Sequence, residues 1–109
     1  MEFKSEKNGG FVVVAPSGRM DALSAPEFEK HCMQWLEQGE SRIVADMAGL
    51  DYISSAGLRS ILSTAKKLKQ AGGEIRFCGL SGMVGDVFRI SGFESMFKTF
   101  ATADEAVAG

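Results

Sequence analysis

Residues 51–58, DYISSAGL, are the stretch around which the chain is organised. A loop that leaves an apolar segment turns here into an amphipathic helix, and two adjacent serines, Ser54 and Ser55, stand at the junction. The first backbone N–H groups of a helix have no partner within it and carry the positive end of its dipole, so they stabilise a phosphate placed there. Serine is also a common helix N-cap. This stretch by itself leaves both interpretations open, a cap or a phosphorylation site.

The length and charge of the chain restrict the class of protein to which it belongs. A chain of 109 residues can bury one core of its own, so we expect a single domain over residues 1–109. A formal net charge of −2 does not favour nucleic acid or an anionic membrane as a partner. No apolar run approaches the ~18 residues of a membrane span, and the first residues lack the apolar core of a signal peptide. We therefore expect a cytoplasmic protein without membrane insertion.

Apolar runs rich in β-branched residues predict the strands. The first two runs should form a hairpin, with the second strand ended by Pro16 and followed by a loop over residues 17–21. Later runs follow helices, which suits strands of a parallel sheet that is covered on both faces. The predicted strands cover residues 3–6, 11–15, 42–46, 74–78 and, at the edge of the sheet, 97–100.

Apolar residues recur at helical spacing between these strands. Capping-box patterns, Ser24 with Glu27 and Thr102 with Glu105, mark the starts of the first and last helices. The predicted helices run from Ser24 to before Gly39, from the serine pair to before Gly72, through residues 83–90, and from Thr102 to the end of the chain. This alternation predicts one α/β sandwich.

Recognisable catalytic and metal-binding motifs are missing from the sequence. The single histidine, His31, falls on a predicted helix, and neither a Gly-x-Ser-x-Gly nor a Ser-x-x-Lys motif occurs. Cys32 and Cys78 have no suitably spaced partner and are interpreted as buried thiols. We therefore expect no enzyme, with no catalytic residues, cofactor or metal site.

Asp46 ends a predicted strand, at the sheet edge where functional groups of α/β proteins collect. A phosphoaspartate receiver domain with Asp46 as its acceptor is therefore an alternative. The sequence lacks the adjacent acidic pair and the closing lysine of that class, which argues against it.

Three segments together resemble the STAS domain family, specifically the bacterial anti-sigma factor antagonists. They are residues 18–21 (GRMD), the strand that ends in Asp46, and residues 51–59 (DYISSAGLR). The resemblance covers nearly the whole chain and implies a STAS-type α/β sandwich, a mixed sheet of four to five strands with about four helices. In that family the serine two positions before Gly-Leu is phosphorylated by a partner kinase, and this register selects Ser55. Ser54, the second choice, stands where many members have aspartate.

The resemblance also implies a function, that of a partner-switching protein. The unphosphorylated form would bind an ATP-dependent serine kinase that is also an anti-sigma factor, phosphorylation of Ser55 would release it, and a serine phosphatase would act on the phosphorylated form. The expected partner-binding residues are Asp21, Asp46, Tyr52, Ser54, Ser55, Gly57 and Arg59. The alternative is a STAS subunit of a transporter or of another signalling complex without a sigma factor.

Overall fold

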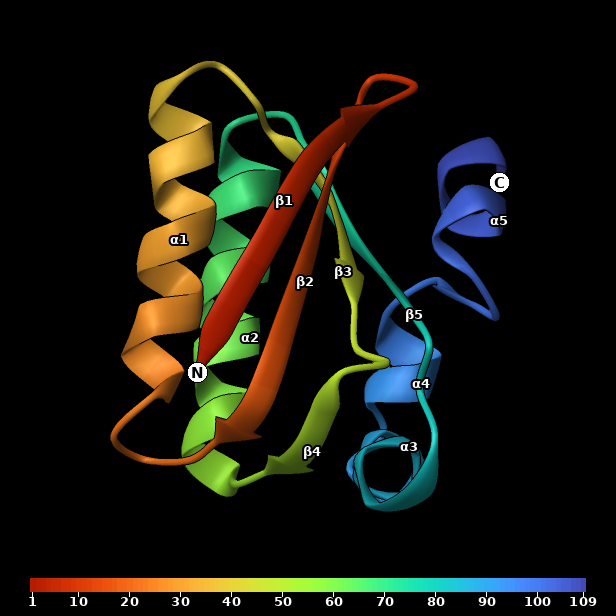
Figure 1. Ribbon diagram of the computed structural model, residues 1–109. Helices are drawn as coiled ribbons and strands as arrows, with labels where there is room; N and C mark the ends of the chain where they lie inside the picture. The colour runs from red at the N-terminus through yellow and green to blue at the C-terminus, as the bar shows by residue number, and fades with distance from the viewer.

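A single mixed sheet organises the computed structural model, which describes residues 1–109 (Figure 1). The strands are β1 (Glu2–Asn8), β2 (Phe11–Met20), β3 (Arg42–Asp46), β4 (Leu50–Ile53), β5 (Glu74–Cys78) and β6 (Thr99–Phe100). The helices are α1 (Ala25–Glu37), α2 (Ser55–Gln70), α3 (Gly82–Ile90), α4 (Phe93–Met96) and α5 (Ala103–Ala108). The predicted α/β sandwich is confirmed, with six strands and five helices in place of the four to five strands and about four helices expected.

The strands follow the order β1-β2-β3-β5-β6, and β4 pairs separately with the end of β2. β1 and β2 form the predicted antiparallel hairpin, while every other pairing is parallel. Parallel pairing requires a crossover between neighbouring strands, and helices provide it: α1 connects β2 to β3. The carboxyl ends of β2 and β4 consequently lie side by side, next to the start of α2.

The second strand is longer than the sequence predicted. β2 does not stop at Pro16 but continues to Met20, so most of the expected loop at residues 17–21 is strand. Pro16 is accommodated opposite Phe3 in the hairpin, and the chain beyond it finds a new partner in β4, with Gly18 N–H donating to the Gly49 carbonyl at 3.1 Å. The prediction was wrong because this pairing comes from a segment that is distant in sequence.

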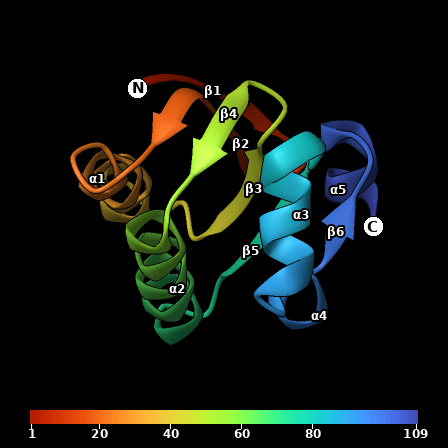
Figure 2. The ribbon, with the colours of Figure 1, turned by 90° about the horizontal axis from the view of Figure 1, so that it is seen from below.

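Helices cover both faces of the sheet (Figure 2). α1 and α2 pack on one face, and the short α5 packs on the other. Alternate residues of β2 therefore enter opposite cores, which explains the uninterrupted apolar run at its start. The larger core contains Val12, Val14, Phe28, Cys32, Ile61, Leu68, Ile75 and Phe77, and the smaller one contains Phe11, Val13, Val44, Cys78 and Ala106.

Both cysteines are buried, as predicted, one in each core. Burial raises the pKa of the Cys32 thiol to about 12, and the Glu29 carboxylate adds to this shift. Burial also raises the pKa of Cys78 to about 12, with a further contribution from Asp46. Both side chains are therefore protonated thiols at neutral pH and serve as small apolar groups in the core.

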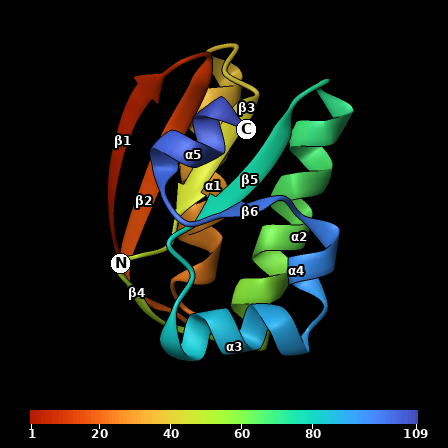
Figure 3. The same cartoon turned by 90° about the vertical axis from the view of Figure 1, so that its right-hand side faces the viewer.

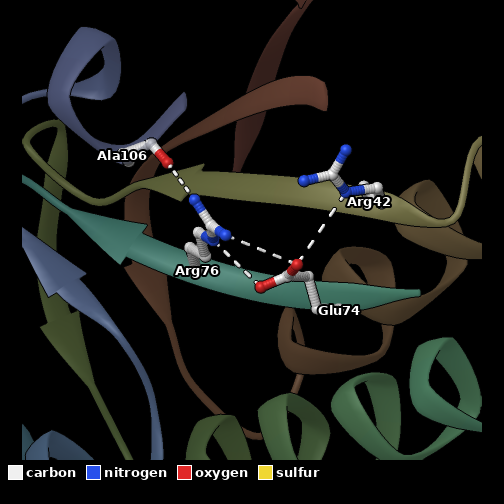
Figure 4. Close-up of polar contacts among 4 residues, drawn as sticks. All are labelled: Arg42, Glu74, Arg76 and Ala106. Carbon is white, nitrogen blue, oxygen red and sulfur yellow. Dashed lines mark hydrogen bonds and ion pairs between the residues drawn. The ribbon is translucent and has the colours of Figure 1, made fainter. Parts of the chain in front are cut away.

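A buried arginine attaches the last helix to the sheet (Figure 4). The Arg76 side chain on β5 donates to the Ala106 carbonyl of α5 at 2.8 Å and to the Glu74 carboxylate at 2.9 Å. Its guanidinium also lies 4.7 Å from the centroid of the Phe11 ring. Because α5 has only six residues and cannot be stable alone, these contacts hold it in place.

Replacing Arg76 with alanine should lower the free energy of unfolding by about 3 kcal/mol, since it leaves the Ala106 carbonyl without its partner and opens a gap beside Phe11. Urea denaturation followed by circular dichroism measures this change. Arg42→Ala is the matched control, because Arg42 is half-exposed, lies 3.8 Å from the same carboxylate and stacks on the same Phe11 ring at 4.1 Å, but makes no hydrogen bond to Ala106; it should cost less than about 1 kcal/mol. Equal losses in the two variants would contradict the role given to Arg76.

Candidate functional site

The two serines have different positions at the start of α2. Ser54 is the N-cap, and its Oγ accepts a hydrogen bond from the Gly57 N–H at 3.3 Å. Ser55 is the first residue of the helix, and its side chain is exposed. Capping therefore belongs to Ser54, while the Ser55 hydroxyl faces solvent beside the free N–H groups of the first turn. A phosphate on Ser55 would lie where the helix dipole stabilises an anion.

Asp21 organises the loop between β2 and α1, which lies next to the serines. Its Oδ1 accepts hydrogen bonds from the backbone N–H of Leu23 at 3.0 Å and from that of Ser24 at 3.1 Å. The backbone hydrogen bond from Ser24 lowers the pKa of the Asp21 carboxyl, so this group is ionised at neutral pH. Asp21 follows Met20, whose carbonyl accepts the Ser54 N–H at 2.9 Å. The negative charge therefore lies beside the serine pair.

The prediction of a capping box at Ser24 is wrong, because its side-chain hydrogen bond does not form. Ser24 precedes α1, but its hydroxyl makes no capping hydrogen bond and donates instead to the Arg19 carbonyl at 2.5 Å. It also accepts the Asp21 N–H at 3.0 Å. The hydroxyl thus closes the loop that presents Asp21, and because it is engaged there it does not cap α1.

A shallow depression lies between the first turns of α1 and α2, and Arg59 is one of the residues that line it. Ala22, Pro26 and Ala56 contribute small apolar surfaces around the same depression. Leu23, next to Ala22 in the loop, is 89% exposed. Leu23 was not among the residues predicted from the sequence, because a leucine in a short loop has no periodic pattern from which its exposure could be inferred.

Tyr52 lies on β4, directly opposite Arg19 of β2. The Arg19 guanidinium stacks over the tyrosine ring, 4.1 Å from its centroid. Tyr52 is half-buried and Arg19 is exposed, so the pair forms a semi-rigid surface next to the serines. Tyr52 therefore packs against Arg19 within the domain, and its part in partner binding stays a prediction.

Gly57 is buried under the serines, where α2 crosses the ends of β2 and β4. A Cβ atom at this position would lie 2.7 Å from Ile53 Cγ1 and 3.0 Å from the Met20 carbonyl oxygen. The glycine was predicted as part of the partner-binding surface, but its missing side chain serves close packing inside the domain. Gly57 acts on the site by allowing the helix to approach the strand.

Asp46 is placed apart from the other predicted residues. Its Oδ1 accepts the Ala48 N–H at 3.1 Å and lies against Gly79, where an added Cβ would come within 2.8 Å of it. None of these contacts is with the serine loop. The structure therefore gathers Asp21, Tyr52, Ser54, Ser55 and Arg59 around the start of α2, whereas Asp46 faces a different part of the surface.

Comparisons with known proteins agree with this architecture. The sequence profile of the STAS domain matches residues 2–106. The chain belongs to the STAS domain family. This STAS domain is 38% identical over 108 residues, 99% of its length, to a protein from Bordetella bronchiseptica named as anti-sigma factor antagonist BtrV, of which the match covers 93%.

Solved structures share the STAS fold. An anti-sigma factor antagonist from Mycobacterium paratuberculosis superimposes with a TM-score of 0.86 at 22% identity, covering 98% of this chain and 91% of that one. The Bacillus cell fate determinant SpoIIAA, solved in a phosphorylated form, has a TM-score of 0.73 at 22% identity, covering 98% and 97%. At these identities the structural likeness concerns the fold.

Two further features of the STAS domain concern its carboxylates and its helices. Nowhere do three or more His, Cys, Asp or Glu side chains gather in an arrangement suited to a metal ion. None of the five helices combines the length and the apolar character that a membrane span requires.

The close packing at Gly57 can be tested by mutation. Gly57→Ala should lower the free energy of unfolding by about 2 kcal/mol, because the added methyl group overlaps Ile53 and Met20. Gly85→Ala is the control: this glycine also lies inside a helix, and its added Cβ would meet nothing closer than 3.4 Å. The control should be neutral or stabilise the domain, since alanine is the better helix former. Thermal denaturation of both variants distinguishes the two outcomes.

Proposed function

We propose that this STAS domain is an anti-sigma factor antagonist that works by partner switching and is not itself an enzyme. Its unphosphorylated form binds an ATP-dependent serine kinase that also acts as an anti-sigma factor. Phosphorylation of Ser55 breaks this complex, and a serine phosphatase restores the binding form. The observation that carries the proposal is the exposed hydroxyl of Ser55 on the first turn of α2, next to a serine that already caps the helix.

The choice of Ser55 over Ser54 rests on their hydrogen bonds. The Ser54 Oγ is held by the Gly57 N–H, so its phosphorylation would remove the helix cap. The Ser55 hydroxyl can be modified without disturbing the backbone of α2. Arg59, one helical turn further along the same face, is placed to compensate part of the new charge. The helix should therefore remain folded in both forms, and the switch consists of a local change in charge.

The proposed contact surface surrounds Ser55. Leu23 supplies an exposed apolar side chain, and Tyr52 and Arg59 supply an amphipathic ring and a cation, residue types that are frequent in protein interfaces. Asp21 already gives this surface a negative charge. A phosphate adds about −1.5 to −2 charge units at neutral pH, so acidic groups of a partner would be repelled.

Ser55→Ala should abolish phosphorylation and leave a constitutive binder of the anti-sigma factor, while Ser55→Asp should bind at least about tenfold more weakly. Phosphopeptide mapping after incubation with native cell extract and ATP measures the first effect. Titration calorimetry with the anti-sigma factor recovered from the same cells measures the second.

Ser54→Ala is the matched control for these variants. It should lose about 1 kcal/mol of folding free energy through the lost cap and still be phosphorylated. Phosphate on Ser55→Ala at the wild-type level would show that the site assignment is wrong. Recovery of a membrane transport complex instead of a kinase would favour the transporter alternative.

Leu23→Asp should weaken binding of the anti-sigma factor by about tenfold or more, because it places a carboxylate in the apolar part of the proposed contact surface. The control is Ile90→Asp on α3, an aliphatic residue that is 81% exposed outside this surface. Both substitutions should leave the unfolding temperature nearly unchanged, since both side chains are solvated. Equal binding by the two variants would remove Leu23 from the contact surface.

A further inference from the structure

A groove of about 500 Å³ runs between the second half of α2 and the outer edge of β5, away from the serines. Its volume lies within the range of ligand-binding pockets, roughly 300–1,000 Å³. Two of its apolar side chains, Leu62 and Met96, are 39% and 58% exposed. The apolar lining consists of Leu62, Ala65, Ile75, Met96 and Phe97.

The edge of β5 has backbone groups without a strand partner in this groove. β6 pairs only with Phe77 and Cys78, so it lies beside the carboxyl-terminal end of β5 (Figure 3). The Glu74 N–H points to the other side and donates to the Ser41 carbonyl at 3.0 Å, while the Phe77 N–H points outwards and donates to the Lys98 carbonyl at 3.0 Å. Because neighbouring residues of a strand bond in opposite directions, the N–H and C=O of Ile75 also point outwards, beyond the reach of β6.

Positive charge surrounds the groove. Lys66, Lys69 and Lys98 line it, and none of the three forms an ion pair within the chain. Glu74 is the only acidic residue among those that line it, and its carboxylate is bound to Arg76 and lies 3.8 Å from Arg42 (Figure 4). In a chain with a net charge of −2, this concentration of unpaired ammonium groups favours an acidic ligand.

We propose that this groove binds an extended acidic segment of a partner protein, which adds to the edge of β5 as a further strand. The backbone of the segment pairs with Ile75, its apolar side chains cover Leu62 and Met96, and its carboxylates meet the three lysines. Side chains of a strand alternate between two faces, so acidic residues at every second position of the segment can all face the same row of lysines.

This surface is independent of the proposed phosphorylation site. Lys66 lies eleven residues after Ser55 on the same helix, which corresponds to about 16 Å along its axis. That separation exceeds the screening length of about 8 Å at physiological ionic strength. The domain can therefore hold a partner at the groove in either phosphorylation state.

The test uses the complete chain labelled with ¹⁵N and the synthetic peptide acetyl-Glu-Val-Glu-Val-Glu-Val-amide. Titration at low salt should shift the amide signals of the groove, and hydrogen exchange of the Ile75 amide should slow by about tenfold or more once a strand pairs with it. A peptide with lysine in place of glutamate should not bind. Ser55→Ala should bind the acidic peptide as the wild type does, whatever the result for the anti-sigma factor.

Lys66→Glu should weaken peptide binding by about tenfold, because an attraction becomes a repulsion. Lys30→Glu on α1 is the control, an exposed lysine outside the groove and without an ion pair, and it should leave binding unchanged. The proposal is overturned if the groove amides do not shift at millimolar peptide, if the two variants lose equal affinity, or if Ile75 exchange is unaffected. Binding of dodecanoate in place of the peptide would equally overturn it, in favour of a lipid-like anion.

Discussion

The close approach of α2 to the end of β2 is the constraint on which the site depends. Gly57 permits it, because any side chain would overlap Met20 and Ile53. The Ser54 N–H bonded to the Met20 carbonyl completes the contact. With the helix held this close to the strand, Ser54 is confined to the cap, and Ser55 is the serine that faces solvent. The glycine in the motif thus fixes the position of both serines from inside the domain.

A single helix serves two surfaces of opposite character. The start of α2 carries the serines beside the ionised Asp21, whereas its second half carries Lys66 and Lys69 along an apolar groove. The sheet makes this separation possible, since α2 spans it from the carboxyl ends of β2 and β4 to the beginning of β5. Glu74 is the only acidic residue that lines the groove, and Arg76 neutralises its carboxylate. The positive character of the groove therefore depends on a contact that also secures the last helix.

The local parts of the site could be predicted from the sequence. Helical spacing after the serines, the apolar strands and the STAS motif identified the fold and pointed to Ser55. The exceptions were features that depend on contacts which the local residue pattern does not reveal. β4 and the end of β2 pair with each other, so the residue pattern of either segment by itself did not predict a strand. Ser24 has a sequence suited to capping, yet its hydroxyl closes the Asp21 loop. Asp46 ends a strand as predicted, but the strand order directs it away from the serines.

The sequence by itself determined the alternation of strand and helix, the buried faces and the position of the two serines, because these follow from residue periodicity and from short-range hydrogen bonding. Tertiary structure alone decided which residues surround the serines and where β5 remains unpaired. These properties depend on how strands distant in sequence pair and on how closely a helix can approach them. No periodic pattern encodes the exposure of Leu23 or the lack of a strand partner at Ile75. Both depend on how the helices and loops pack against the sheet.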